Sequence, residues 1–318
     1  MTDIAIPPAT QKHSSARRRM SALTRRNLRH GLIFIAPWII GFTLFTAYPI
    51  LASLVYSFTD HDVLTTSTFV GIANYRDLLT TDHLFFKAVT NTFYFALVSI
   101  PLTIVLGVSI ALLLNLEVRG MSIYRTVFFL PSIVPQVASA LLWAWILNPQ
   151  FGLANSILKS IGLPQLGWLS DPVWSKPSIV LMGLWAVGGT MVIYLAALQD
   201  VPKDLYEAAD IDGATAWRKT RSITLPLITP TIFFNLVLGT ISTFQAFTQI
   251  YVLTQGQGGP LDSTLVYGLL LYRNAFSYLK MGYASAMAWL LFAFIVLVTF
   301  VIFRSSGRWV FYQGEVRQ

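Results

Sequence analysis

Few side chains of this sequence sit in arrangements that could perform covalent chemistry. No Gly-Lys dipeptide occurs among the 318 residues, which excludes a phosphate-binding P-loop. The four histidines, at positions 13, 30, 61 and 83, lie outside the most apolar stretches, and cysteine is absent. Because no nucleophile stands beside a general base, the sequence predicts no catalytic residue, no metal site and no enzymatic activity in this chain.

Side chains that can bind a ligand without reacting with it concentrate in one apolar stretch. Neutral hydrogen-bonding residues are interleaved there with Phe244 and Phe247. They are Asn235, Thr240, Ser242, Thr243, Gln245, Thr248 and Gln249. Amides beside aromatic rings suit a sugar, because its hydroxyl groups need donors and acceptors while its C–H faces stack on rings. The alternative is that these residues hold membrane helices together.

The elements that position these residues follow from the distribution of charge. Hydrophobic residues make up 55% of the chain and charged residues 11%, whereas a soluble domain has roughly 25% charged residues. Six stretches of 23 residues or longer lack Asp, Glu, Lys and Arg, and about 20 apolar residues suffice for a helix to cross a bilayer. We predict an all-α integral membrane protein with six transmembrane helices. They lie at about 32–57, 89–115, 126–147, 177–199, 229–253 and 282–303.

Lys and Arg are distributed unequally between the connecting segments. With the N-terminus in the cytoplasm, the inner segments hold 16 of the 22 Lys and Arg residues and the outer segments hold six. The positive-inside rule therefore predicts that both termini are cytoplasmic. The same rule accounts for the net charge of +8 without a nucleic-acid partner. No Asp, Glu, Lys, Arg or His lies within the predicted spans, which argues against a proton-coupled transporter.

The predicted spans divide the chain into three parts. Residues 1–28 are expected to form a basic cytoplasmic tail without fixed structure, because they are polar and rich in Ser and Arg. Residues 29–304 form the six-helix transmembrane domain, and residues 305–318 form a second cytoplasmic tail. Between the first two spans, segment 60–87 predicts a turn followed by a short amphipathic helix at the outer interface.

The cytoplasmic loop 200–230 has the pattern of an ordered segment. Pro202 can open a helix, with Glu207 in one of its first turns. Gly213 then breaks the helix, a second short helix is expected at about 214–221, and Pro226 redirects the chain toward the membrane. Small side chains at the elbow would let another surface approach closely. The alternative is an ordinary surface loop.

The residues of this loop resemble the EAA motif of ABC-importer permeases. The matching positions, in the spacing of the motif, are Glu207, Ala208, Ala209, Gly213, Ile223, Leu225 and Pro226. Other residues resemble the first permease subunit of carbohydrate importers of the maltose and glycerol-3-phosphate type. They are Asp212-Gly213-Ala214, Arg125 with Leu130-Pro131, and Leu253-Thr254 followed by Gly258-Gly259-Pro260 and Thr264. One departure is the insertion-like Gln255-Gly256-Gln257, which lengthens the stretch before Gly258.

The resemblance implies a permease subunit of an ABC importer in the bacterial cytoplasmic membrane, carrying a sugar or oligosaccharide. Its implied partners are a second homologous permease, two ATPase subunits and an external sugar-binding protein. No cofactor is expected on this chain, because ATP and Mg²⁺ would bind the ATPase. The residues implied in docking the ATPase are Glu207, Ala208, Ala209, Asp212, Gly213, Ala214, Ile223, Leu225 and Pro226.

The resemblance to the maltose permease also implies a substrate path from two segments. Its residues would be Trp185, Gly188, Gly189 and Thr190, together with Ser242, Thr243, Gln245 and Gln249. The glycines have an alternative role in close helix packing or a kink. Two other functions stay open: a permease for another solute such as a glycerol phosphate ester, polyamine, phosphate or peptide, and a channel or scaffold without an ATPase. The Gly-Gly-Pro segment argues against the first, and the EAA spacing argues against the second.

Overall fold

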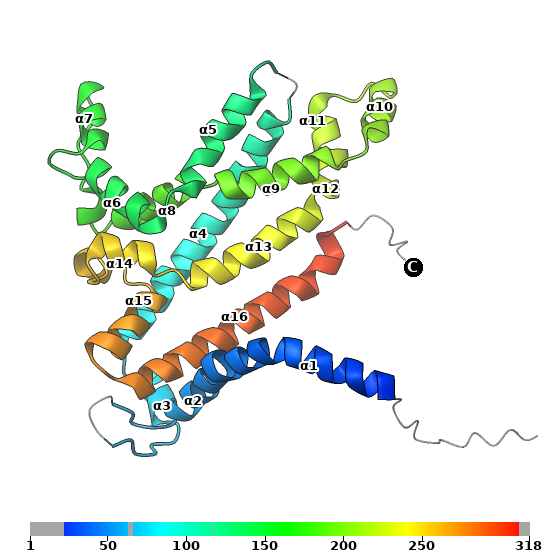
Figure 1. Cartoon of the computed structure of the whole chain (residues 1–318). Helices are drawn as coiled ribbons and strands as arrows, with labels where there is room; N and C mark the ends of the chain where they lie inside the picture. The colour runs from blue at the N-terminus through cyan, green and yellow to red at the C-terminus, as the bar shows by residue number, and fades with distance from the viewer. Residues whose placement is uncertain (1–21, 63–65, 117, 312–318) are drawn as a thin grey trace, which may run out of the picture. The chain divides into compact units, whose positions relative to one another are not determined.

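The computed structural model describes residues 22–62, 66–116 and 118–311, and within these ranges the chain is helical without a β-strand. Residues up to Ser53 and residues from Leu54 onward form two units, which are described separately. In the first unit, α1 (Ala22–Phe42) continues through a π-helical turn at Thr43–Ala47 into α2 (Tyr48–Tyr56) (Figure 1). The wider turn lies just before Pro49, whose ring and missing N–H disrupt regular helical bonding.

The second unit holds the remaining helices (Figure 1). They are α3 (Ala73–Thr80), α4 (His83–Leu114), α5 (Met121–Ile133), α6 (Gln136–Ile146), α7 (Leu153–Ser160), α8 (Ser175–Trp185), α9 (Gly188–Gln199), α10 (Lys203–Ile211), α11 (Ala216–Lys219), α12 (Leu225–Leu227), α13 (Thr229–Phe244), α14 (Thr248–Thr254), α15 (Tyr267–Tyr272) and α16 (Met281–Trp309). Single turns of 3₁₀ or π helix lie at Trp168–Ser170, Thr220–Thr224, Pro260–Asp262 and Arg273–Ser277. The short helix α3 confirms the helix predicted within segment 60–87.

Within the described residues, four helical stretches are long and apolar enough to cross a membrane, namely Arg26–Tyr56, His83–Leu114, Thr229–Thr254 and Met281–Trp309. Two bent pairs reach this length only together: α5 with α6, bent by 98°, and α8 with α9, bent by 48°. Counting each pair as one span gives up to six, at the six predicted places. The single helices predicted at 126–147 and 177–199 are therefore corrected to two helices each.

The sharper bend has a local cause in proline. Val134 adopts an extended conformation (φ −67°, ψ 127°), because a residue before proline is disfavoured in the helical region. Pro135 then cannot donate a backbone hydrogen bond, and α6 starts at the next residue. The helix predicted at 229–253 is also interrupted, because α13 ends at Phe244 and Phe247 adopts a non-helical conformation (φ −148°, ψ −62°).

Helix α4 is the central element of the second unit. Its first half packs in a cluster with α8, α14, α15 and α16, around buried residues such as Phe85, Ile250 and Met287. Its second half packs with α9 in another cluster, around Ala111, Met191 and Tyr194. Both clusters therefore depend on one 32-residue helix, whose N-terminus is capped by the carboxylate of Asp82.

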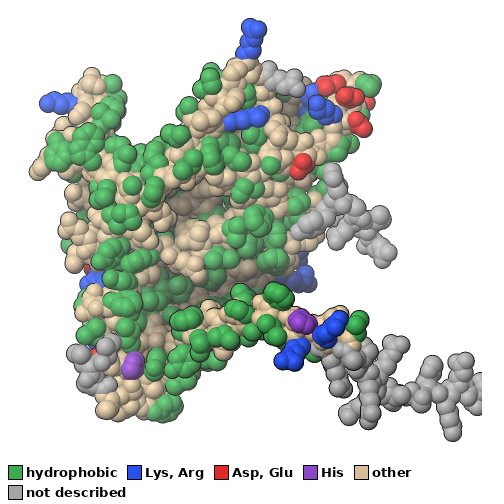
Figure 2. Space-filling view, viewed as in Figure 1, with side chains coloured by type: hydrophobic (Ala, Val, Ile, Leu, Met, Phe, Trp, Pro, Cys, Tyr) green, Lys and Arg blue, Asp and Glu red, His purple; other side chains and the backbone are tan. Residues whose placement is uncertain are grey.

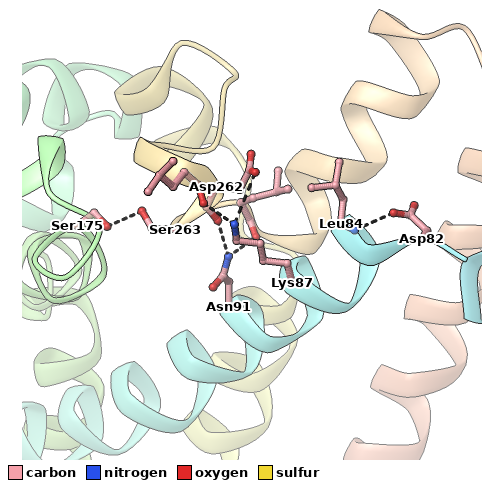
Figure 3. Close-up of polar contacts among 9 residues, drawn as sticks. Asp82, Leu84, Lys87, Asn91, Ser175, Asp262 and Ser263 are labelled. Atoms are coloured by element: carbon pink, nitrogen blue, oxygen red, sulfur yellow. Dashed lines mark hydrogen bonds and ion pairs between the residues drawn. The ribbon is translucent and has the colours of Figure 1, made fainter.

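The loop that joins α14 to α15 is fastened to α4 and α8 by polar contacts (Figure 3). The side-chain amide of Asn91 donates to the carbonyls of Asp262 and Leu265, both at 2.9 Å. Lys87 donates to the carbonyl of Leu261, and its ammonium lies 3.7 Å from the carboxylate of Asp262. On the other side, the hydroxyls of Ser175 and Ser263 lie 2.8 Å apart. Loop and helices are thereby held together.

Helical structure extends beyond the predicted tail boundaries toward both ends of the chain. Helix α1 begins at Ala22, before the predicted boundary at residue 28, and residues 1–21 of that tail lie outside the described residues. Helix α16 continues to Trp309, past the predicted boundary at residue 305, and residues 312–318 likewise lie outside the described residues. The helices thus continue beyond the apolar stretches and include charged residues such as Arg304.

Two adjacent glycines provide a matched test of the packing between α9 and α5. A Cβ on Gly188 would lie 2.2 Å from the carbonyl oxygen of Phe128, whereas the nearest atom to a Cβ on Gly189 is Ser132 Cβ at 3.8 Å. We expect Gly188→Ala to destabilise the protein by about 1–3 kcal/mol through overpacking. Gly189→Ala should be neutral, or stabilising by about 0.4–1 kcal/mol. Thermal melting of the purified transporter measures both, and equal melting temperatures would contradict this packing.

The loop contacts allow a second comparison. Asn91 is buried, so Asn91→Leu leaves two carbonyls without their donor, at about 1–3 kcal/mol for each unsatisfied group. Lys87 and Asp262 are 44% and 34% exposed, so Lys87→Met should cost no more than about 1 kcal/mol. We expect Asn91→Leu to lower the melting temperature more than Lys87→Met does. The reverse order would mean that the ion pair, and not the amide, fixes the loop.

Candidate functional site

A cavity of about 350 Å³ lies where the chain breaks between α13 and α14. It is surrounded by four parts of the second unit. The lining residues are Phe95, Ser99 and Thr103 from α4, Gln136 from α6, Ile179, Val180 and Gly183 from α8, and Ser242, Thr243, Gln245, Ala246, Phe247, Thr248, Gln249 and Ile250 from the break and its flanks. The bend at Pro135 places Gln136, the first residue of α6, at this cavity.

The described residues that line the cavity are polar or apolar but never charged. The side-chain amides of Gln136, Gln245 and Gln249 form no hydrogen bond with any group in the part of the chain that the structure describes. Each amide offers two donors and one acceptor oxygen, so these groups can pair with a ligand that both donates and accepts. The lining therefore fits a neutral, hydroxyl-rich solute.

The structure brings together only one of the two predicted groups of path residues. Ser242, Thr243, Gln245 and Gln249 line the cavity. Trp185, Gly188, Gly189 and Thr190 are not among the described residues that line it. Instead, Trp185 packs edge-on against Trp143, with ring centroids 5.9 Å apart, and Gly188 lies against the backbone of α5. For Gly188, the geometry favours the alternative role of close helix packing, whereas a Cβ on Gly189 would have room.

Three polar cavity residues escaped the sequence analysis. Ser99 and Thr103 lie one turn apart on α4, and Gln136 belongs to a helix distant in sequence from α13. Single hydroxyls within apolar helices commonly bond to their own backbone, so nothing marks them as ligand-binding. The position of Gln136 directly after Pro135 was the one available signal, because a polar residue there begins a new helix inside an apolar stretch.

The predicted docking loop forms two helices joined by a left-handed elbow. Gly213 has φ +71°, and no atom lies within 4 Å of a Cβ built on it. The amides of Gly213 and Ala214 donate to the carbonyls of Asp210 and Ala209, at 3.1 and 2.9 Å. These bonds close α10 in the way typical of a glycine-terminated helix. The elbow is stabilised further by Lys219, whose ammonium lies 2.6 Å from the carboxylate of Asp210.

One side of this loop is anchored to the membrane helices. Ile223 and Leu225 pack against the cluster formed by α4 and α9, and the hydroxyls of Tyr206 and Thr224 lie 2.8 Å apart. A π-helical turn at Thr220–Thr224 precedes Pro226, and the chain stays helical through Leu227. The redirection toward the membrane at Pro226 stays a prediction. The second helix begins at Ala216 and not at 214.

The other side of the loop is exposed and mixes acidic with apolar groups. Glu207, Ala208 and Asp212 are exposed, while Ala209 and Ala214 are half-buried. Ile211 and Trp217 are 88% and 71% exposed. Figure 2 shows the acidic side chains gathered over α10, beside basic side chains of α11. An anchored inner side and an exposed outer side with large apolar residues are typical of a surface that binds a partner.

The chain matches a family of transport proteins and is similar to its relatives over most of its length. Residues 103–311 match the family described as binding-protein-dependent transport system inner membrane component. The chain is 40% identical over 308 residues to the probable ABC transporter permease protein YesP of Bacillus subtilis, covering 96% of this chain and 99% of that protein. It is 34% identical over 292 residues to the lactose transport system permease protein LacF of Rhizobium radiobacter, covering 90% and 97%.

The fold is also similar to that of a solved transporter. A chain in the crystal structure of a bacterial alginate ABC transporter, in complex with an alginate pentasaccharide-bound periplasmic protein, matches with a TM-score of 0.78 and 25% identity. The match covers 91% of this chain and 98% of that chain. The predicted all-α permease fold and the absence of an enzymatic role are thus confirmed. The protein is a multi-pass membrane protein of the binding-protein-dependent transport system inner membrane components, the permease subunits of ABC importers.

Proposed function

We propose that this permease translocates a neutral sugar or oligosaccharide through the cavity between α13 and α14. The observation that carries the proposal is the uncharged lining, with three amides that have no partner in the described chain. A phosphate ester or a polyamine would require compensating charge on entering such a site. The relatives named for lactose and alginate transport support a carbohydrate as the class of solute.

The proposal includes the arrangement of the chain in the membrane and its partners. The six-helix domain spans the cytoplasmic membrane with both termini and loop 200–230 inside, in agreement with the excess of Lys and Arg in those segments. A second homologous permease completes the translocation path, and an external sugar-binding protein delivers the solute. Two ATPase subunits supply the energy and hold ATP and Mg²⁺, since this chain has no P-loop sequence.

The docking site for the ATPase in this proposal is the exposed side of the α10–α11 elbow. Glu207, Ile211 and Trp217 are available to a partner there, whereas Ile223 and Leu225 join the loop to α4 and α9. When the ATPase displaces the elbow, the displacement is therefore transmitted to α4 and α9, which form the cluster around Ala111, Met191 and Tyr194. Gly213, with its positive φ, forms the turn between α10 and α11.

The elbow allows a test in which backbone strain is the variable. Because the φ of Gly213 is +71° and a Cβ there would meet no atom within 4 Å, the main effect expected of Gly213→Val is backbone strain. We expect this variant to assemble in the membrane but to lose most of the ATP hydrolysis that sugar-loaded binding protein stimulates. Gly213→Asn should keep more of it, because asparagine tolerates the left-handed region. Unchanged hydrolysis and transport in Gly213→Val would contradict the docking role.

The sugar path is tested at Gln245. Losing one hydrogen bond to a neutral group costs about 0.5–1.5 kcal/mol, so we expect Gln245→Ala to weaken transport modestly and to change the preference among sugars. Uptake of several sugars by the reconstituted complex measures the preference, and melting without sugar measures stability. A variant that melts early yet keeps the original preference would assign Gln245 to helix packing and defeat the site assignment.

A further inference from the structure

A proline in the first turn of α13 leaves a weak point directly after the predicted docking loop. Pro230 has no N–H, so the carbonyl of Pro226, four residues earlier, loses its regular helical donor. Ile228, between α12 and α13, departs from the regular helical conformation (φ −92°, ψ 2°). With no further contact, a displacement of the loop would bend the chain at Ile228 and leave α13 where it is.

The hydroxyl of Thr229 takes the place of the missing donor. Its Oγ1 donates to the carbonyl of Pro226 at 2.6 Å. The same oxygen accepts a hydrogen bond at 2.9 Å from the backbone N–H of Phe311, just beyond the end of α16. A hydroxyl has one hydrogen to donate and lone pairs that accept, so both bonds form together. One half-buried residue thus connects the end of the docking loop, the start of α13 and the end of α16.

Helix α16 is also held against α13 by aromatic contacts along its length. Near the docking loop, Phe233 of α13 packs edge-on against Phe303 and Trp309, with ring centroids 5.0 and 6.0 Å apart. Toward the cavity, the rings of Phe244 and Phe294 lie 5.0 Å apart. Figure 1 shows the two helices side by side, with α12 and the end of α16 at the same end. A displacement applied at that end therefore acts on both helices.

We propose that Thr229 is a positioning residue that couples displacement of the docking loop to α13 and α16. Its two hydrogen bonds stiffen the chain at Ile228 and fasten the loop to the end of α16. This inference rests on the proposed function, because it requires an ATPase that displaces the elbow. It adds a second route to the one through α4 and α9. The new route runs along α13 to Ser242 and Gln245 at the cavity.

The two hydrogen bonds of Thr229 can be removed from two different positions. Thr229→Val keeps the shape of the side chain and removes both bonds, whereas Thr229→Ser keeps the hydroxyl. Phe311→Pro removes the N–H donor, and Val310 already has the extended conformation (φ −85°, ψ 129°) that suits a residue before proline. Phe311→Ala is the matched control, because it keeps the N–H and removes a ring that is 51% exposed.

A second control addresses the exchange of threonine for valine within α13. The hydroxyl of Thr240 donates to the carbonyl of Leu236 in the same helix. Thr240→Val therefore removes a hydroxyl from α13 without touching the docking loop or α16. It should leave the coupling unchanged.

The measurement follows the cavity and needs no transported solute. The chain has no cysteine, so Ser242→Cys places its one thiol at the cavity. In the complete transporter, mass spectrometry of this chain measures the rate at which N-ethylmaleimide labels that thiol, with and without ATP and vanadate. We expect the nucleotide to change this rate. The change should shrink roughly two- to tenfold in Thr229→Val and in Phe311→Pro, the range that one neutral hydrogen bond spans.

The control variants and the double variant complete the expected result. Thr229→Ser, Phe311→Ala and Thr240→Val should keep the full response to nucleotide. Thr229→Val combined with Phe311→Pro should lose no more than the larger of the single losses, because both changes remove the same contact. Sugar imported per ATP hydrolysed should fall in parallel with the labelling response.

The outcomes separate this inference from the proposed function. An unchanged response in both Thr229→Val and Phe311→Pro overturns the coupling role. A lower melting temperature with an unchanged response also overturns it, because the contact would then only hold the fold together. If the Ser242→Cys complex without further changes shows no response to nucleotide, the proposed ATPase coupling is contradicted, and this inference with it. A normal response without sugar uptake contradicts only the proposed solute.

Discussion

Every backbone N–H and C=O group in the interior of a bilayer has to be paired within the protein, because no water is present to replace a missing partner. A continuous helix satisfies this requirement automatically, and an interrupted one does not. In this protein the interruptions fall at Val134–Pro135, at Ala186–Val187 and at Gln245–Phe247. Irregular backbone at membrane depth is tolerated where it is buried in protein or faces a cavity.

The interruptions determine where the functional surfaces lie. The break after α13 places Gln245 at the cavity, and the break before α6 brings Gln136 to the same cavity. The bend between α8 and α9 places Gly188 against the backbone of α5. Helix α4 crosses all of this as one continuous element and contributes to both core clusters. The cavity is thus lined on one side by a continuous helix and elsewhere by interrupted helices.

The features that depend on local sequence pattern could be predicted from the sequence. The charge-free stretches indicated the places of the spans, and the helix break at Gly213 followed from its position between two helical patterns. The bends could not be predicted from the positions of the prolines. Pro101 lies inside the continuous helix α4, whereas Pro135 lies at the break between α5 and α6. Which outcome a proline produces depends on whether neighbouring helices can pair the freed carbonyl, and that is a tertiary property. For the same reason, Gly188 could not be assigned to packing before its contact with Phe128 was known.

The uncharged cavity has an electrical consequence. Moving one elementary charge across the membrane is worth about 2.3 kcal/mol per 100 mV of potential. A neutral solute passing described wall residues that bear no charge moves no charge through that field. For the neutral solute proposed above, translocation therefore involves no electrical work, and we expect uptake to continue in a cell with a collapsed potential but intact nucleotide pools.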